Sequence, residues 1–228
     1  MSEPSVEAHY RAVQRLWDCE RPVHAITTPE YFAEIGEKLL VQLRPGGQRL
    51  LDVGCGTGDI MMWLGTQGLD CYGFDFADAK LSEAERKNPG RVWKQSFLEP
   101  FKNGAFDYIV SWTVLQYCRP SELVAVLRHS IDALTIGGQC VHAAVPVMEM
   151  FDGANGVYYK ANGEDELNLH WTRFEAAARY GMPVTEDGTF FNYCSVAREA
   201  VLALGHEFRS YVHGTSRYRM TFEIIRKH

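Results

Sequence analysis

Glycines stand at positions 54, 56 and 58, and carboxylates lie on both sides of them in the sequence, at Asp52 and Asp75. Glycine allows a tight turn and lets the backbone approach a ligand without interference from a Cβ atom. A carboxylate can accept two hydrogen bonds from a vicinal diol such as that of ribose. The pattern therefore predicts a turn that borders a small ligand, with carboxylates nearby that can accept hydrogen bonds.

The glycine spacing argues against two common nucleotide motifs. A dinucleotide fingerprint requires glycine at its first, third and sixth positions, and the sixth position here is Asp59. An aspartate at a helix N-terminus would also repel a pyrophosphate. A P-loop is excluded because no Gly-Lys-Ser or Gly-Lys-Thr follows. The glycine spacing therefore disfavours a nicotinamide oxidoreductase. Tight binding of NAD would support that alternative.

The elements around the glycines alternate between short apolar strands and helices, which is typical of a parallel sheet covered on both faces. The last two strands are joined by a turn too short for a crossover, so they form an antiparallel hairpin. We predict strands at 49–53, 69–74, 91–94, 106–112, 139–145, 206–212 and 218–225, with helices at 58–67, 77–87, 121–134 and 195–204. The expected fold class is α/β: a doubly wound, Rossmann-like, mainly parallel seven-stranded sheet with a reversed C-terminal strand.

Two further segments complete the single domain predicted for residues 1–228. Residues 1–46 form a helical cap, in which Thr28 and Pro29 suit an N-cap and a first helical position. Residues 147–191 form an insertion after the fifth strand that is rich in glycine and aromatic residues. Structureless loops of this length are uncommon, and we interpret the insertion as a substrate lid.

Several segments together resemble one known family. Residues 52–58 read Asp-Val-Gly-Cys-Gly-Thr-Gly, Gly73-Phe74-Asp75 ends the second strand, and 106–111 forms the fourth strand. The chain thereby resembles the class I S-adenosylmethionine-dependent methyltransferases, whose first motif is an acidic residue followed by Gly-x-Gly-x-Gly. The resemblance covers about residues 49–145 by motif and 193–226 by topology only.

The resemblance implies S-adenosylmethionine (SAM) as the cofactor. It places the methionine part along the glycine loop and the ribose on Asp75. After the third strand, where the family often has an acid for adenine, either Gln95 or Ser96 takes that place. The predicted cofactor-binding residues are Tyr10, Asp52, Gly54, Cys55, Gly56, Asp75, Phe76, Ser96, Phe97 and Trp112.

Motifs that the sequence lacks narrow the range of possible methyl acceptors. The Asn/Asp-Pro-Pro-aromatic signature, a Pro-Cys dipeptide and a paired-glutamate loop are all absent, which disfavours nucleic-acid and protein-arginine methylation. We predict O- or N-methylation of a small molecule, with a sugar of a glycan or glycosylated metabolite, or a non-catalytic binding subunit, as alternatives. The candidate bases are His24, His142 and His170. The predicted substrate-binding residues are Trp17, Tyr117, His170 and Trp171.

Composition supports a small-molecule enzyme. The net charge is −6 without a dense Lys/Arg run, so nucleic acid is an unlikely partner. No apolar run approaches the ~20 residues of a membrane span, and no signal peptide is visible, so we expect a cytoplasmic protein. The six cysteines contain no Cys-x-x-Cys, and the single pair Cys140 and His142 does not predict a metal site. The sequence does not predict the oligomeric state.

Overall fold

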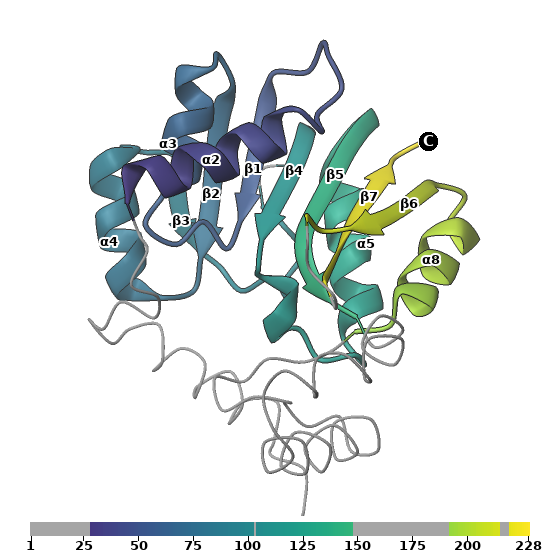
Figure 1. Cartoon of the computed structure of the whole chain (residues 1–228). Helices are drawn as coiled ribbons and strands as arrows, with labels where there is room; N and C mark the ends of the chain where they lie inside the picture. The colour runs from purple at the N-terminus through teal and green to yellow at the C-terminus, as the bar shows by residue number, and fades with distance from the viewer. Residues whose placement is uncertain (1–27, 103, 148–191, 215–218) are drawn as a thin grey trace, which may run out of the picture.

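A computed structural model describes residues 28–102, 104–147, 192–214 and 219–228 (Figure 1). Its centre is a seven-stranded sheet in the order β3-β2-β1-β4-β5-β7-β6. β7 is antiparallel to both neighbours, and the other adjacent pairs are parallel. The predicted fold class is therefore confirmed. The strands are β1 (Arg49–Val53), β2 (Asp70–Asp75), β3 (Val92–Lys94), β4 (Phe106–Trp112), β5 (Leu134–Pro146), β6 (Glu207–Val212) and β7 (Arg219–Ile225).

Helices cover both faces of the sheet (Figure 1). On one face, α2, α3 and α4 bury apolar residues against β1, β4 and β5. On the other face, α5 and α8 enclose the larger core. The helices are α2 (Pro29–Leu40), α3 (Asp59–Thr66), α4 (Asp78–Lys87), α5 (Leu123–Ala133) and α8 (Cys194–Ala203), and a short 3-10 helix, η1 (Leu115–Tyr117), follows β4.

Helix α2 begins where the sequence predicted. The Thr28 hydroxyl accepts a hydrogen bond from the Tyr31 amide at 3.3 Å, which satisfies one of the free N–H groups of the first turn. The buried face carries Ile35 and Leu39. A Cβ atom at Gly36 would overlap the ring of Trp63, so α2 packs closely against α3.

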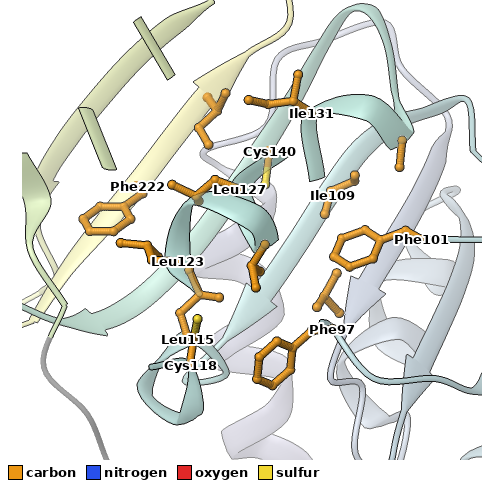
Figure 2. Packing of buried hydrophobic residues seen from close by; sticks show 14 of the residues in the cluster. Phe97, Phe101, Ile109, Leu115, Cys118, Leu123, Leu127, Ile131, Cys140 and Phe222 are labelled. Atoms are coloured by element: carbon orange, nitrogen blue, oxygen red, sulfur yellow. The ribbon is translucent and has the colours of Figure 1, made fainter. Parts of the chain in front are cut away.

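The larger core lies between the sheet and α5. Figure 2 shows Leu123, Leu127 and Ile131 of α5 pointing toward Ile109 and Cys140 of the sheet. These α5 residues repeat at four-residue intervals, which places them on one helix face. This packing fixes β4 and β5, whose carboxyl ends lie beside the predicted site.

β5 begins earlier than predicted. Residues 134–138, which precede the predicted strand 139–145, belong to β5, since Leu134 already pairs with Phe106 of β4. The register shifts between Phe106 and Tyr108, and Gly137 has a φ of +83°. The glycine absorbs an irregularity that an uninterrupted strand could not contain. Among the described residues, no helix is long and apolar enough to cross a bilayer.

Candidate active site

The glycine loop turns sharply between β1 and α3. The Gly54 and Cys55 amides both donate to the Phe74 carbonyl of β2, at 2.9 and 3.0 Å. Gly54, Gly56 and Gly58 have φ values of +70°, +55° and +73°, which side chains disfavour. The loop is therefore tied directly to the carboxyl end of the second strand, as its motif predicts.

The three glycines face different surroundings. A Cβ at Gly54 would lie 2.5 Å from Cγ2 of Val114, and one at Gly58 would lie 3.2 Å from the backbone Cα of Ala84 in α4. Among the described residues, a Cβ at Gly56 would meet nothing within 4 Å. Gly54 and Gly58 thus permit close packing, whereas Gly56 leaves space on the side of the cavity described below.

Asp75 ends β2 and is almost completely buried, with 8% of its surface exposed. Its Oδ1 accepts the amides of Phe76 and Ala77 at 2.7 and 3.0 Å, and its Oδ2 accepts the Gly56 amide at 2.9 Å. Burial raises the pKa of this carboxyl, and the three N–H donors oppose that rise. With about four lone-pair sites on a carboxylate, part of its accepting capacity remains for a ligand.

Asp52, which is predicted to bind the cofactor, lies beneath the loop and is not among the residues that line the cavity. It is 2% exposed, and its Oδ2 has no hydrogen-bond partner within the described structure. Burial, with repulsion from Asp75 second, raises its pKa to about 8. The alternation of β1 explains the position, since Leu51 and Val53 face the α5 side and Asp52 points the opposite way.

A cavity of about 450 Å³ opens between the glycine loop, β2, α2, α4 and the end of β4. This volume is in the usual range for small-molecule sites. Aromatic side chains from several elements contribute to it, and its charged groups come from β2, α3 and α4. The lining residues include Tyr31, Phe32, Ile35, Gly54, Cys55, Gly56, Thr57, Asp59, Asp75, Phe76, Lys80, Glu83, Lys87, Gln95, Phe97, Trp112, Thr113, Val114 and Tyr117.

The repulsion of a pyrophosphate predicted from the sequence treats Asp59 as an unpaired negative charge. In the structure, Asp59 forms an ion pair. Lys87 binds both of its carboxylate oxygens, at 2.7 and 2.8 Å, and also binds Glu83 at 2.7 Å. The Thr57 hydroxyl donates to Asp59 at 2.5 Å. The ion pair weakens the predicted repulsion of a pyrophosphate, because α4 supplies a compensating cation that the motif does not reveal.

Of the two residues considered for adenine, Gln95 lines the cavity and Ser96 does not. The cofactor contact of Ser96 stays a prediction. Ser96 turns back and accepts the Leu98 amide at 3.2 Å. The Gln95 amide is also engaged within the protein, accepting from the Trp93 indole at 2.7 Å and donating to the Pro100 carbonyl at 2.9 Å. Phe97 lines the cavity as predicted.

The opposite wall of the cavity runs from the end of β4 into η1. Trp112, Thr113, Val114 and Tyr117 line it, and none of these side chains is charged. Thr113 has a φ of +58°, which is uncommon for a β-branched residue. Its hydroxyl donates to the Trp112 carbonyl at 2.6 Å. We call residues 112–117 the β4–η1 wall.

His142, one of the candidate bases, lies away from the cavity. It is fully buried between β5 and α5 and does not line the cavity. Its Nδ1 lies 2.8 Å from the Ser111 hydroxyl, and its Nε2 lies 3.1 Å from both Ser130 and Cys140. Burial lowers its pKa to about 4, so the imidazole is neutral at pH 7. His142 is a hydrogen-bonded core residue. The described residues contain no metal-binding cluster.

Other predicted residues lie outside the described ranges: Tyr10, Trp17 and His24 in the cap, and His170 and Trp171 in the insertion. The structure adds Tyr31, Phe32 and Lys87 to the cavity, which sequence reasoning missed. Phe32 is an apolar residue of α2, but its residue type and spacing did not show that this part of the helix borders a ligand site.

A family model described as a methyltransferase domain matches residues 24–183. This match spans most of the chain, including the glycine loop, Asp75 and the β4–η1 wall. The chain belongs to this methyltransferase family, and the predicted resemblance is confirmed.

Similar proteins agree with the family. An uncharacterized methyltransferase, sll0829, of Synechocystis sp. is 29% identical over 94 residues, which is 40% of this chain and 44% of that protein. The chain spans about half the length of the curated relatives it matches.

Solved structures share the fold. One is the magnesium protoporphyrin IX methyltransferase of Synechocystis with bound SAH (TM-score 0.59, 15% identity, covering 95% of this chain and 94% of that one). Another is SAM-bound CalS10 of Micromonospora echinaspora, an amino pentose methyltransferase (TM-score 0.59, 19% identity, covering 99% and 98%).

Proposed function

We propose that this protein transfers a methyl group from SAM to oxygen or nitrogen of a small-molecule acceptor. The observation that carries the proposal is the position of Asp75, a buried carboxylate at the end of β2 that lines the cavity next to the glycine loop. Family membership, established by the match over residues 24–183, supports the same reaction class.

The described residues fit such a cofactor. Asp75 retains accepting capacity for ribose hydroxyls, and Phe76 and Phe97 offer apolar surface beside it for a base. Gly56 leaves open space where a side chain would project. Asp59, Glu83 and Lys87 form an ion-pair cluster of two negative charges and one positive charge. The cavity therefore suits a ligand that carries both positive and negative charge better than a polyanion.

SAM, when bound, supplies an electrophilic methyl group on a sulfonium. The protein's contribution is then to align the acceptor, and alignment alone can supply much of the rate of such a displacement. The β4–η1 wall offers Trp112, Val114 and Tyr117 as surfaces for a flat or apolar acceptor. No histidine lies among the cavity-lining residues within the described structure. A base, if the acceptor requires one, comes from outside this set, with His24 and His170 as the sequence candidates.

The acceptor class stays a proposal. The names of the structural neighbours include a porphyrin and an amino pentose, so a ring-shaped small molecule is our first choice and a sugar our second. A non-catalytic binding subunit is the remaining alternative, and turnover with any acceptor would exclude it. Cytoplasmic location and the absence of a nucleic-acid partner stay predictions.

Calorimetric titration with S-adenosylhomocysteine (SAH) tests the cofactor site. Replacing Asp75 by Ala removes the charged acceptor of the ribose, so we expect affinity to fall about tenfold to a hundredfold. Asp78→Asn, an exposed aspartate at the start of α4, is the matched control and should bind SAH like the wild type. Unchanged affinity in Asp75→Ala would contradict the ribose role.

A ligand-side comparison separates ribose binding from damage to the loop, because Asp75 also holds backbone amides. The wild type should bind adenosine more tightly than 2′,3′-dideoxyadenosine, and Asp75→Ala should lose that discrimination. If the wild type binds the two nucleosides with equal affinity, the Asp75 carboxylate does not bind the ribose diol. Methyl transfer is then assayed with isotopically labelled SAM and a small-metabolite extract, with mass spectrometry as the readout.

A further inference from the structure

The β4–η1 wall needs support from outside β4. Its first residue, Trp112, ends the strand and is followed by the unusual backbone conformation of Thr113. The Thr113 amide donates to the Ala143 carbonyl at 3.1 Å, which fixes the main chain at this point. A main-chain bond does not fix the direction of the indole. The contacts of the ring itself must do so.

One such contact comes from the turn end of the β6–β7 hairpin. The imidazole of His213 packs against the Trp112 ring edge-to-face, with centroids 4.7 Å apart and planes at 75°. Aromatic pairs favour this geometry. His213 is itself held twice by β7, because its Nδ1 lies 3.0 Å from the hydroxyl of buried Thr221 and its backbone N–H donates to the Arg219 carbonyl at 2.9 Å.

A second contact from the same end of the hairpin reaches η1. One guanidinium nitrogen of Arg219 donates to the Gln116 side chain at 2.8 Å and to the Ala144 carbonyl at 2.9 Å. Gln116 is buried and lies immediately before Tyr117, which lines the cavity. Ala144 lies in the irregular part of β5, with a φ of +59°. Arg219 therefore links the start of β7, the bulge of β5 and the end of the wall.

We propose that His213 and Arg219 are positioning residues that fix the β4–η1 wall, His213 by holding the Trp112 indole and Arg219 by holding η1 through Gln116. The importance of this wall for an acceptor rests on the proposed function. The packing of His213 and Arg219 against the wall does not rest on it, so this proposal and the proposed function can fail separately. The hairpin thus builds one side of the cavity without lining it.

The charge state of His213 agrees with this role. Burial first, and then Arg219 and Lys38, lower its pKa. Lys38 is itself paired with Glu34 on α2 at 2.6 Å. A neutral imidazole packs against the indole without drawing a counterion into the wall.

Fluorine NMR of the chain labelled with 5-fluorotryptophan tests the positioning of Trp112. The five tryptophans give separate probes, and Trp112→Phe assigns the resonance of interest. We expect His213→Ala to shift and broaden the Trp112 resonance and leave the other four in place, and His213→Phe to restore a narrow line because a ring is present again. Arg219→Met should also shift it through η1, and Arg219→Lys should shift it less.

His206→Ala is the matched control, since His206 lies next to β6 at the other end of the hairpin and packs against His228, 4.8 Å away. It should leave the Trp112 resonance unchanged. If His213→Ala does not fold, Thr221→Val keeps the ring but removes its hydrogen bond, and broadening is expected there as well. A Trp112 resonance that is identical in wild type, His213→Ala and Thr221→Val overturns the proposal.

SAH titration of the same variants separates this proposal from the proposed function. SAH affinity in His213→Ala should weaken no more than about threefold to tenfold, the range expected for loss of one aromatic pair. If the wild type binds neither SAH nor SAM, the proposed function fails while the fluorine result still decides the role of the hairpin.

Discussion

The two sides of the cavity are held in different ways. The glycine loop is fixed by the adjacent strand β2, with the Gly54 and Cys55 amides bound to the Phe74 carbonyl and the Gly56 amide bound to the Asp75 carboxylate. The β4–η1 wall is fixed by side chains that arrive from much later in the chain, with Arg219 and Gln116 separated by 103 positions. The first arrangement is contained in one motif. The second exists only once the hairpin has joined the sheet.

The two sides meet at Gly54, which gives the largest expected effect. Gly54→Ala forces a side chain into a positive φ and brings its Cβ to 2.5 Å from Val114 of the wall. We expect the free energy of unfolding to fall by about 2–4 kcal/mol, from backbone strain and overpacking together. Urea denaturation at pH 7 measures the loss.

Gly56→Ala is the matched variant, because Gly56 has a similar φ but no atom of the described part of the chain lies within 4 Å of the new Cβ. It should cost only the backbone strain, about 1 kcal/mol. Its methyl group would project into the cavity, so SAH affinity should fall more than stability does. Equal losses of stability in the two variants would mean that the loop and the wall are not in tight contact at Gly54.

The second effect concerns the cost of burying Asp52 beneath the loop. Its folded pKa of about 8 lies above the ~3.9 of an unfolded aspartate. Between these values the folded protein holds a proton that the unfolded chain has released, so the free energy of unfolding falls as pH rises from about 4 to 8. Asp52→Asn should remove part of this fall, about 1–3 kcal/mol at pH 8 relative to pH 5.

Urea denaturation of wild type and Asp52→Asn at pH 5, 6, 7 and 8 measures that difference. The pKa of Asp75 is also raised by burial, so some pH dependence should persist in the variant. Parallel curves for the two proteins would show that Asp52 titrates normally and that the glycine side carries no such electrostatic cost.

The same contrast explains what the sequence could predict. The succession of strands and helices along the chain, the reversed β7 and the glycine loop follow from hydrophobic patterns and a short motif. Asp75 was located through the family resemblance, because it stands at the end of the predicted second strand, where the family has an acid. All of these signals are local, or depend on the rules by which a parallel sheet assembles.

Residues whose role depends on tertiary packing could not be placed in this way. His142 had a suitable residue type near the end of β5, but the alternation of that strand turns it into the α5 interface. Lys87 reaches Asp59 from 28 positions away, and His213 reaches Trp112 across two intervening strands. A charge or ring that arrives from another element leaves no local pattern, so neither contact could be inferred from spacing.

Two asparagines give the smallest and most closely matched test of the two sides. Asn88 donates to the carbonyls of Gly58 and Ala84 beside the glycine loop, at 3.1 and 3.2 Å. Asn192 donates to the carbonyls of Leu115 and Cys118 around η1, at 2.9 and 3.4 Å. Asn88 is half-buried, whereas Asn192 is fully buried.

Replacing each by Ala should therefore have unequal effects in urea denaturation. Water can reach the carbonyls near Asn88, so Asn88→Ala should cost about 0.5 kcal/mol or less. Asn192→Ala leaves buried carbonyls without their donor, but it also removes the Oδ1 atom of Asn192, which has no partner in the described structure. The net loss should be about 1 kcal/mol. A larger loss for Asn88→Ala would reverse the comparison, because the glycine side would then depend on side-chain support more than the wall does.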